Sequence, residues 1–346
     1  KRLEGIVRKT PLICSEFFSD ISGNATYLKL ENLQTTGAFK LRGAYNRISM
    51  LTEEEKARGV ITASAGNHAQ GVAYASQKLG VNAVICMPAT TPILKVEATR
   101  ALGATVVLHG NGFDDAYAHS LELQKEKGYV YIHPFNDRDV IVGQGTIALE
   151  VIDALKDVDA ILVPVGGGGL SSGIALAVKL VNPQVKVIGV EPENAACMKA
   201  ALSCGRTITL PSADTVADGC AVRTAGKLTL EFCRLYLDEI ITVSEMEIMS
   251  ALLSLIEKHK LIAEGAGVLS LAALSKLRMK DKKVAVLISG GNIDISTISA
   301  LISKALISRG RVFRFSVQLP DKPGQLLTVA QILTDQDANV IRLDHD

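Results

Sequence analysis

A run of four glycines, Gly166 to Gly169, stands between an apolar stretch and a segment of helical character. Residues 160–165 read Ala-Ile-Leu-Val-Pro-Val, and residues 170–178 read Leu-Ser-Ser-Gly-Ile-Ala-Leu-Ala-Val. A strand that breaks into glycines and opens a helix directs several backbone N–H groups and the positive end of the helix at one point, where a phosphate can bind. Glycine is needed there because a Cβ atom would block the close approach of a ligand. The chain is therefore predicted to hold a phosphorylated ligand.

The glycine run does not match the two commonest phosphate-binding loops. No Gly-Lys-Ser or Gly-Lys-Thr follows it, which disfavours a Walker-type nucleotide loop, and the spacing Gly-x-Gly-x-x-Gly is absent in its usual form. Glu191, the acid after the next predicted strand, is weak support for a dinucleotide site. The alternative is a glycine-rich turn that serves only the tight packing of strand and helix.

Three further segments accompany the glycines. Residues 36–44 read Thr-Gly-Ala-Phe-Lys-Leu-Arg-Gly-Ala and place Lys40 beside the aromatic Phe39 among small residues. Residues 64–71 read Ser-Ala-Gly-Asn-His-Ala-Gln-Gly, and residues 289–292 read Ser-Gly-Gly-Asn after a predicted strand. A lysine amine becomes nucleophilic only when its pKa is lowered, and a partly apolar site beside a bound cation or dipole lowers it. Alone, Lys40 would be interpreted as a solvated charge.

Together these four segments, in this order, resemble the fold-type II pyridoxal-phosphate enzymes, and most closely the threonine and serine ammonia-lyases. The resemblance covers residues 1 to about 308. It implies an α/β fold similar to the β-subunit of tryptophan synthase, with two three-layer αβα lobes and parallel-rich sheets. The smaller lobe, about residues 41–138, would be inserted in the larger one, within a catalytic domain of residues 1–310. The implied cofactor is pyridoxal 5'-phosphate.

The resemblance also implies a role for each matching residue. Lys40 would form the Schiff base with the cofactor aldehyde and abstract the α-proton of the substrate, and Phe39 would pack against one face of the ring. Asn67 would hydrogen-bond the ring hydroxyl, and Ser289 would face the pyridine nitrogen. The residues that would hold the phosphate are Gly166, Gly167, Gly168, Gly169 and Leu170. The segment that resembles the substrate-carboxylate loop consists of Ser64, Ala65, Gly66, Asn67 and His68.

Ser289 bears on the type of reaction. A carboxylate facing the pyridine nitrogen would keep the ring protonated and a deep electron sink, whereas a hydroxyl leaves it largely neutral. The weaker sink shortens the life of the α-carbanion, which favours prompt loss of a β-hydroxyl over transamination.

Two departures from related serine racemases help to choose among family members. Ala65 stands where those relatives have a serine that protonates the opposite face, and a methyl group cannot transfer a proton. Their divalent-cation site resembles Glu191, the carbonyl of Ala195 and an acid two residues later, where this chain has Cys197. A hard cation prefers oxygen ligands, so no Mg²⁺ site is expected, and a weaker monovalent-ion site stays open.

Composition excludes several classes of function. The chain has 346 residues with 48% hydrophobic content, and its formal net charge of +1 provides no electrostatic footprint for nucleic acid or an anionic membrane. No apolar run approaches the ~20 residues of a membrane-spanning helix. Six scattered cysteines without a Cys-x-x-Cys pair fit reduced thiols in a cytoplasmic protein. Arg42 has two readings, a carboxylate ligand or an ion pair within the fold.

Short β-rich runs alternate with helical stretches from about residue 57, which is the signature of βαβ units and a largely parallel sheet. The predicted strands are residues 60–63, 83–87, 105–108, 129–131, 160–165, 186–190 and 285–288. The predicted helices between them are residues 71–79, 93–102, 114–127, 146–155 and the segment that begins at residue 170. Ligands of such sheets bind beyond the carboxyl ends of strands, where residues 63–66 and the four glycines both lie.

The last residues follow a different pattern. Apolar residues at 313, 315, 317 and 319 alternate with polar ones and predict a half-buried antiparallel strand. A turn at residues 320–324, a helix over about 325–334 and a second strand over 339–343 complete one β-α-β unit. The turn Asp321-Lys322-Pro323-Gly324 resembles the opening of an ACT regulatory domain, a ferredoxin-like module that pairs across subunits. Residues 311–346 would then form its first half.

These observations favour a cytoplasmic pyridoxal-phosphate lyase that converts L-threonine to 2-oxobutanoate and ammonia, with L-serine as a poorer substrate. The resemblance implies a homodimer or homotetramer. The alternatives are an L-serine ammonia-lyase, a serine racemase and, from a different class, a non-catalytic amino-acid sensor. One methyl group separates threonine from serine and is worth only about 1–3 kcal/mol in an apolar pocket. The motifs shared by both lyases therefore leave the substrate open.

Overall fold

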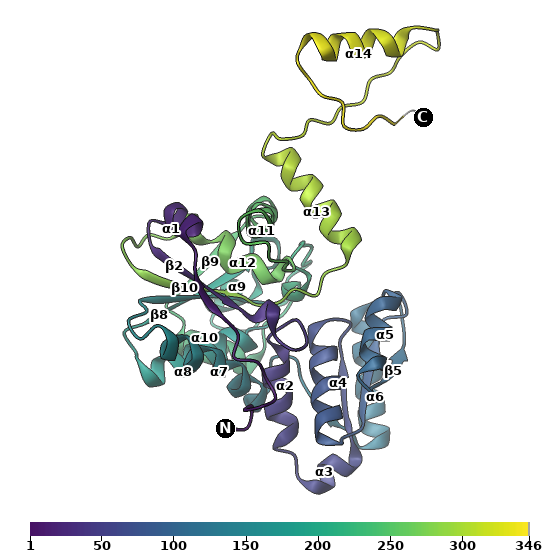
Figure 1. Ribbon diagram of the computed structural model, residues 1–346. Helices are drawn as coiled ribbons and strands as arrows, with labels where there is room; N and C mark the ends of the chain where they lie inside the picture. The colour runs from purple at the N-terminus through teal and green to yellow at the C-terminus, as the bar shows by residue number, and fades with distance from the viewer. Residues whose placement is uncertain (345–346) are drawn as a thin grey trace. The chain divides into compact units, whose positions relative to one another are not determined.

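The computed structural model describes residues 1–344 as two compact units, residues 1–305 and the residues from 306 onward. The first unit contains two sheets, each covered by helices (Figure 1). None of the helices within residues 1–344 is both long and apolar enough to cross a membrane.

The larger sheet has six strands, and only its edge pair β1–β2 is antiparallel. In order across the sheet the strands are β1 (Leu12–Cys14), β2 (Ala25–Leu30), β10 (Lys283–Ile288), β7 (Ala160–Pro164), β8 (Lys186–Pro192) and β9 (Glu239–Val243). The smaller sheet is all parallel, in the order β5 (Thr105–Leu108), β4 (Ala83–Met87), β3 (Val60–Ala63) and β6 (Val130–Tyr131).

Fourteen helices accompany these strands within the described residues. They are α1 (Glu16–Ser22), α2 (Lys40–Ser49), α3 (Glu53–Arg58), α4 (Asn67–Leu79), α5 (Ile93–Ala101), α6 (Phe113–Lys127), α7 (Arg138–Ala154), α8 (Gly169–Val181), α9 (Cys197–Cys204), α10 (Lys227–Tyr236), α11 (Glu245–His259), α12 (Leu269–Ala272), α13 (Ile295–Ser308) and α14 (Gln325–Asp335). Short 3-10 turns are η1 (Glu31–Leu33), η2 (Glu193–Ala195), η3 (Asp218–Cys220), η4 (Ala266–Val268) and η5 (Leu274–Lys276).

The central strands are buried on both faces, which is why they read as continuous apolar runs. In the smaller sheet Val60 and Ile85 pack toward α2 and α4, while Ile61 and Cys86 pack toward α6. In the larger sheet the side chains of Ile161, Val187 and Leu287 pack against α7 and α8, and α12 contacts β7, β8 and β10. Both sheets are therefore the middle layer of an αβα arrangement, as the family resemblance implies.

Three helices of the first unit pack backbone against backbone through glycines. A Cβ atom on Gly143 of α7 would stand 2.5 Å from the carbonyl oxygen of Arg42 in α2. One on Gly145 would stand 2.5 Å from the carbonyl oxygen of Gly173 in α8. Distances this short leave no room for a side chain. Helix α7 therefore joins α2, which begins at Lys40, to α8, which begins at Gly169.

Arg42 takes part in a buried ion network. Its guanidinium contacts Glu31 at 2.8 Å and Glu150 at 2.6 Å, and Glu150 also accepts from Lys29 at 2.6 Å. The Lys29 amine donates a further hydrogen bond of 2.7 Å to the carbonyl of Thr10. Of the two readings of Arg42, the ion pair within the fold is therefore the one that the structure contains.

Two predicted helices begin earlier than expected. Helix α4 starts at Asn67 and not at residue 71, and α7 starts at Arg138 and not at residue 146. The Asp137 carboxylate caps α7 by accepting from the N–H groups of Asp139 and Val140. Gly143 and Gly145 weaken the helical pattern of α7 before residue 146, and α4 begins with Asn67 and His68, which have low helix propensity. The sequence therefore placed both starts too late.

In the second unit the predicted helix is present as α14, but the two predicted strands are wrong. Residues 313–319 and 339–343 form no ladder within the described part of the chain. A strand needs a paired neighbour and a covered face, whereas α14 has no buried residue and Phe313 is 84% exposed. The alternation of apolar and polar residues thus indicates a surface without a partner in this unit.

Candidate active site

A cavity of 1330 Å³ opens between the two lobes, at the carboxyl ends of β3, β7 and β10. Every residue assigned to the site in the sequence lines it: Phe39, Lys40, Ser64, Ala65, Gly66, Asn67, His68, Gly166, Gly167, Gly168, Gly169, Leu170 and Ser289. Segments that are far apart along the chain thus meet at one place, as expected for the carboxyl ends of parallel strands.

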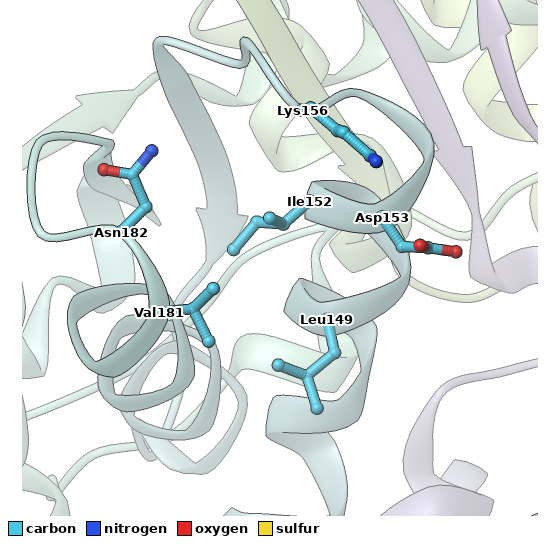
Figure 2. Close-up of a pocket in the computed structure, with 6 residues that line it drawn as sticks. All are labelled: Leu149, Ile152, Asp153, Lys156, Val181 and Asn182. Atoms are coloured by element: carbon cyan, nitrogen blue, oxygen red, sulfur yellow. The ribbon is translucent and has the colours of Figure 1, made fainter.

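A second hollow of 470 Å³ lies on the surface at the ends of α7 and α8, away from these residues (Figure 2). It is lined by Leu149, Ile152, Asp153, Lys156, Val181 and Asn182. Figure 2 shows the aliphatic side chains of Leu149, Ile152 and Val181 at this hollow, with the Asp153 and Lys156 side chains beside them. Asp153 is committed to an exposed ion pair with Lys9 at 3.0 Å. The residues assigned to the site in the sequence therefore all lie in the interlobe cavity, and none of them lines this hollow.

Lys40 is the first residue of α2 and its side chain enters the cavity. The Nζ atom donates to the carbonyl oxygen of Pro134 at 2.9 Å and lies 5.2 Å from the centre of the Phe39 ring. Burial lowers the pKa of this amine to about 8, although negative charge at Cys220 and Glu264 would raise it. A lysine with a carbonyl partner and a lowered pKa is a usable nucleophile and base near neutral pH.

The segment before Lys40 is fastened to the turn that follows β10. The N–H group of Phe39 donates to the carbonyl of Ser289 at 3.1 Å, and Ala38 pairs with Gly290 in an isolated bridge. Ser289 is buried and its hydroxyl lies 3.4 Å from the carbonyl oxygen of Ala266. The lysine and the serine hydroxyl are therefore held on one backbone frame at the cavity wall.

The glycine run turns its carbonyl oxygens into the protein. Gly166 accepts from the Cys197 thiol, Gly167 accepts from the Thr229 hydroxyl at 2.6 Å, and Gly168 accepts from Ser172. The first N–H groups of α8 have no partner within the helix. Gly168 has a φ of +93°, a conformation that favours glycine. The loop thus leaves N–H groups and the positive helix end for an anion in the cavity.

Asn67 is oriented by a partner at each end of its amide. Its Nδ2 donates to Glu264 Oε1 at 2.6 Å, and its Oδ1 accepts from Asn292 Nδ2 at 2.8 Å. Asn292 Nδ2 also donates to the carbonyl of Thr36 at 2.7 Å. Asn67 comes from the smaller lobe and its two side-chain partners come from the larger one.

Two histidines at the cavity serve the backbone. His68 Nε2 lies 2.9 Å from the carbonyl oxygen of Ile132, and burial lowers the pKa of this ring to about 3. His133 Nδ1 accepts from the N–H groups of Phe135 and Asn136, and burial lowers its pKa to about 4. Both rings are therefore neutral near pH 7, and each holds a loop in place.

Several residues that line the cavity were missed in the sequence, among them Glu264, Cys220 and Phe135. Glu264 belongs to the run Ala263-Glu264-Gly265, which has no recognisable motif. Phe135 packs against the glycine loop so closely that Cβ atoms on Gly167 or Gly169 would meet it at 2.5 and 2.8 Å. Such contacts arise only from the fold and leave no signal at short range in the sequence.

Glu191 is buried and accepts from the N–H groups of Met198 and Lys199, each at 2.8 Å. It therefore caps the start of α9. Among the described residues no group of three or more His, Cys, Asp or Glu side chains is arranged to hold a metal ion.

The residues present fit a phosphorylated pyridine aldehyde. The glycine loop offers N–H groups for a phosphate, because a Cβ at any of its positions would meet neighbouring atoms and its carbonyls already have partners. Lys40 offers an amine of lowered pKa, Asn67 an oriented amide and Ser289 a buried hydroxyl, all on the same cavity. These are the groups that pyridoxal phosphate requires.

Comparison with known proteins agrees with this fit. An L-threonine ammonia-lyase from Thermotoga maritima is 49% identical over 100% of this chain and 86% of its own length. A catabolic L-threonine dehydratase from Escherichia coli strain K12 is 45% identical over 87% of this chain and 93% of its own. The solved structure of the processed form of threonine deaminase isoform 2 from Solanum lycopersicum has a TM-score of 0.84 and 43% identity, and covers 87% of this chain and 89% of that one.

The family described as pyridoxal-phosphate dependent enzymes matches residues 3–290. This match spans both lobes and includes the cavity residues from Phe39 to Ser289. The two αβα lobes are those of the fold-type II enzymes. The chain belongs to the family of pyridoxal-phosphate-dependent enzymes.

Proposed function

We propose that this protein is an L-threonine ammonia-lyase, which converts L-threonine to 2-oxobutanoate and ammonia. The observation that carries the proposal is the convergence of Lys40, Asn67, Ser289 and the glycine loop on one cavity. The ammonia-lyase and dehydratase names of relatives at 45–49% identity support the same activity.

The glycine loop with Leu170 would hold the cofactor phosphate, Phe39 would cover one face of the ring, Asn67 would donate to the ring hydroxyl, and Ser289 would face the ring nitrogen. Once bound, pyridoxal phosphate supplies an electron sink for the negative charge left on the α-carbon of an amino acid. Lys40 is placed to anchor it, because its amine is the nucleophile at the cavity wall.

Lys40 also serves as the base. An amine whose pKa is lowered to about 8 is neutral in a substantial fraction of molecules near that pH and accepts the α-proton of the substrate. The β-hydroxyl then leaves as water. The released enamine takes up one water and yields the 2-oxo acid and ammonia, so that the water lost in elimination is regained.

The substrate carboxylate would bind at Ser64 to His68. Helix α4 begins at Asn67, so the N–H groups of its first turn and the positive helix end are available to an anion there. The neutral His68 ring stays on the Ile132 carbonyl and packs behind this turn. Ala65 lines the cavity with a methyl group, which supports a lyase and disfavours a racemase.

With pyridoxal phosphate bound, the Ser289 hydroxyl would leave the ring nitrogen largely neutral, which would favour elimination over transamination. In the variant Ser289→Asp, the ratio of transamination to elimination should rise, as measured by pyridoxamine phosphate formed against 2-oxo acid released. An unchanged ratio would remove Ser289 from this role.

Two broader proposals concern assembly. We infer that residues 311–346 belong to an ACT-like regulatory domain, of which the described residues contain helix α14 but neither predicted strand, and that the protein is a homodimer or homotetramer. The exposed apolar side chains of α14, Leu326, Leu327 and Ile332, support a surface that another chain segment covers. Sedimentation of the full chain with and without isoleucine or valine tests both, since a monomer that ignores these amino acids would contradict them.

The primary test is kcat/KM for 2-oxo-acid formation from L-threonine and from L-serine, with Lys40→Ala as the blank. A preference for threonine that the substitution abolishes is the expected result. A preference for serine would transfer the protein to the sister L-serine ammonia-lyases. A purified protein that stays colourless on addition of pyridoxal phosphate would instead favour a non-catalytic sensor.

A further inference from the structure

Glu264 is a buried carboxyl on the cavity wall that the proposed chemistry does not use. It precedes η4, is 5% exposed, and its backbone is fixed at both groups: its N–H donates to the carbonyl of Gly290, and its carbonyl accepts from Gly267. Its Oε1 accepts the 2.6 Å hydrogen bond from Asn67. Gly290 follows Ser289, and a Cβ atom at this position would collide with the Glu264 carboxyl. The glycine therefore provides the space that this carboxyl fills.

The amide of Asn67 can face in only one direction between its two partners. Thr36 accepts from Asn292 Nδ2 at 2.7 Å, and this backbone carbonyl fixes the NH₂ group of Asn292 toward Asn67. A flipped Asn67 would place its NH₂ group against that of Asn292 and its oxygen against the Glu264 carboxyl. In the observed orientation one N–H of Asn67 is used by Glu264, and the other is available to a group in the cavity.

We propose that Glu264 is a positioning residue, which together with Asn292 locks the Asn67 amide in the orientation that presents an N–H group to the cofactor. The inference rests on the proposed function of the cavity and extends it. Since Asn67 stands on the smaller lobe and Glu264 and Asn292 on the larger one, the same hydrogen bonds tie the two lobes together at the cofactor site.

The charge on Glu264 varies near neutral pH while this geometry persists. Burial raises the pKa of Glu264 to about 8, and Asp218 raises it further in the same direction, whereas the Asn67 hydrogen bond, Lys95 and Lys40 oppose the shift. Burial raises the pKa of the Cys220 thiol, and the Glu264 charge raises it further. A protonated carboxyl still accepts from Asn67 through its carbonyl oxygen. The hydrogen bond therefore fixes the orientation of the Asn67 amide, and the negative charge on Glu264 raises the pKa of the neighbouring Lys40.

The test follows the release of cofactor from the holoenzyme, read as loss of its visible absorbance on dilution. Glu264→Leu removes the acceptor and should release the cofactor about tenfold faster, the usual worth of a buried hydrogen bond. Glu264→Gln keeps an acceptor oxygen and should release it at nearly the wild-type rate. Its absorbance should titrate at a lower pH, because the negative charge that favours protonation at Lys40 is gone. Glu191→Gln removes a buried carboxyl outside the cavity and is the matched control.

A double-mutant cycle separates positioning from general support of the fold. If Glu264 acts through Asn67, the variant Asn67→Ala/Glu264→Leu should release cofactor no faster than Asn67→Ala alone. Rates that multiply in the double variant, or Glu264→Leu and Glu264→Gln that both match wild type, would overturn the proposal. So would a Glu264→Gln variant as fast as Glu264→Leu, or an equal effect of Glu191→Gln.

If Glu264→Leu does not fold, as judged by circular dichroism, Asn292→Ala takes its place in the same cycle with the same expected non-additivity. The outcome is separate from that of the proposed function. A protein that binds pyridoxal phosphate but does not act on threonine leaves this test intact, whereas a wild-type protein that never becomes coloured refutes the proposed function itself.

Discussion

The two buried lysines Lys29 and Lys40 differ in the groups that surround their side-chain amines. Lys29 lies 2.6 Å from Glu150 and donates to a carbonyl at 2.7 Å, within a network that also contains Arg42 and Glu31. Lys40 has the carbonyl of Pro134 as its hydrogen-bond partner and opens into the cavity. Burial lowers the pKa of both amines. The difference that separates a structural lysine from a reactive one is therefore the presence of a carboxylate within contact distance.

The same contrast holds for two buried carboxyls. Glu191 and Glu264 both have a pKa raised by burial, to about 7 and about 8. Glu191 accepts from two backbone N–H groups and closes a helix end, whereas Glu264 accepts from a side chain that faces the cavity. Burial alone thus does not mark a functional group. A functional group is marked by its hydrogen-bond partner and by its exposure to the cavity.

The largest effects are expected when each of the two lysines is replaced in turn. Lys40→Ala should lower kcat/KM for 2-oxo-acid formation by about 10²–10⁴-fold, because the base is lost, while leaving the free energy of unfolding nearly unchanged. Lys29→Met should do the reverse and destabilise the fold by about 3 kcal/mol, since it leaves Glu150 with one partner fewer. Steady-state kinetics and urea unfolding of both variants measure this. Equal loss of activity in the two would end the distinction.

Within the ion network, Glu31→Gln should cost about 3–5 kcal/mol of unfolding free energy. The substitution leaves the Arg42 guanidinium buried with only Glu150 as its carboxylate partner. Chemical denaturation at pH 7 is the measurement. A change below about 1 kcal/mol would indicate that water replaces the lost carboxylate. The ion network would then contribute little to stability.

Glu191→Gln should alter the pH dependence of stability. Because the folded-state pKa of about 7 lies above the ordinary value of 4.5, Glu191 binds its proton more tightly in the folded protein. The stability that protonated Glu191 contributes to the folded state is fully present below pH 4.5 and is lost as the pH rises to 7. Unfolding free energies of wild type should therefore fall relative to those of the variant across this window, by on the order of 2 kcal/mol. Parallel curves would show that the carboxyl is already ionised when folded.

The smallest effect is expected at an exposed pair of similar geometry. Lys9 and Asp153 lie 3.0 Å apart, yet their side chains are 68% and 67% exposed. Asp153→Asn should change the unfolding free energy by less than about 0.5 kcal/mol and leave kcat/KM unaltered. Since Asp153 also lines the surface hollow of Figure 2, a loss of activity here would give that hollow a function.

The sequence predicted the parallel-rich sheets and the four segments that meet at the cavity, because strands buried on both faces and glycine-rich turns are local patterns. It did not predict Glu264 or Phe135. Glu264 acts through a hydrogen bond with Asn67, which lies 197 residues away in the sequence. Phe135 packs against the Gly167 loop, which belongs to a different strand-helix unit. The strands at residues 313–319 and 339–343 were wrong because alternation specifies a face and does not supply the partner that a strand requires.

The glycine contacts among α2, α7 and α8 also limit how this protein can be redesigned. Lys40 begins one of these helices and Gly169 begins another, with α7 between them. Because a methyl group added at Gly143 or Gly145 would meet backbone atoms first, at 2.5 Å, no rotamer change can absorb it. A substitution at either glycine would therefore move the Lys40 amine relative to the phosphate loop and lower activity toward every substrate. A mutant library that aims at new substrates should vary residues at the mouth of the cavity and leave these two glycines unchanged.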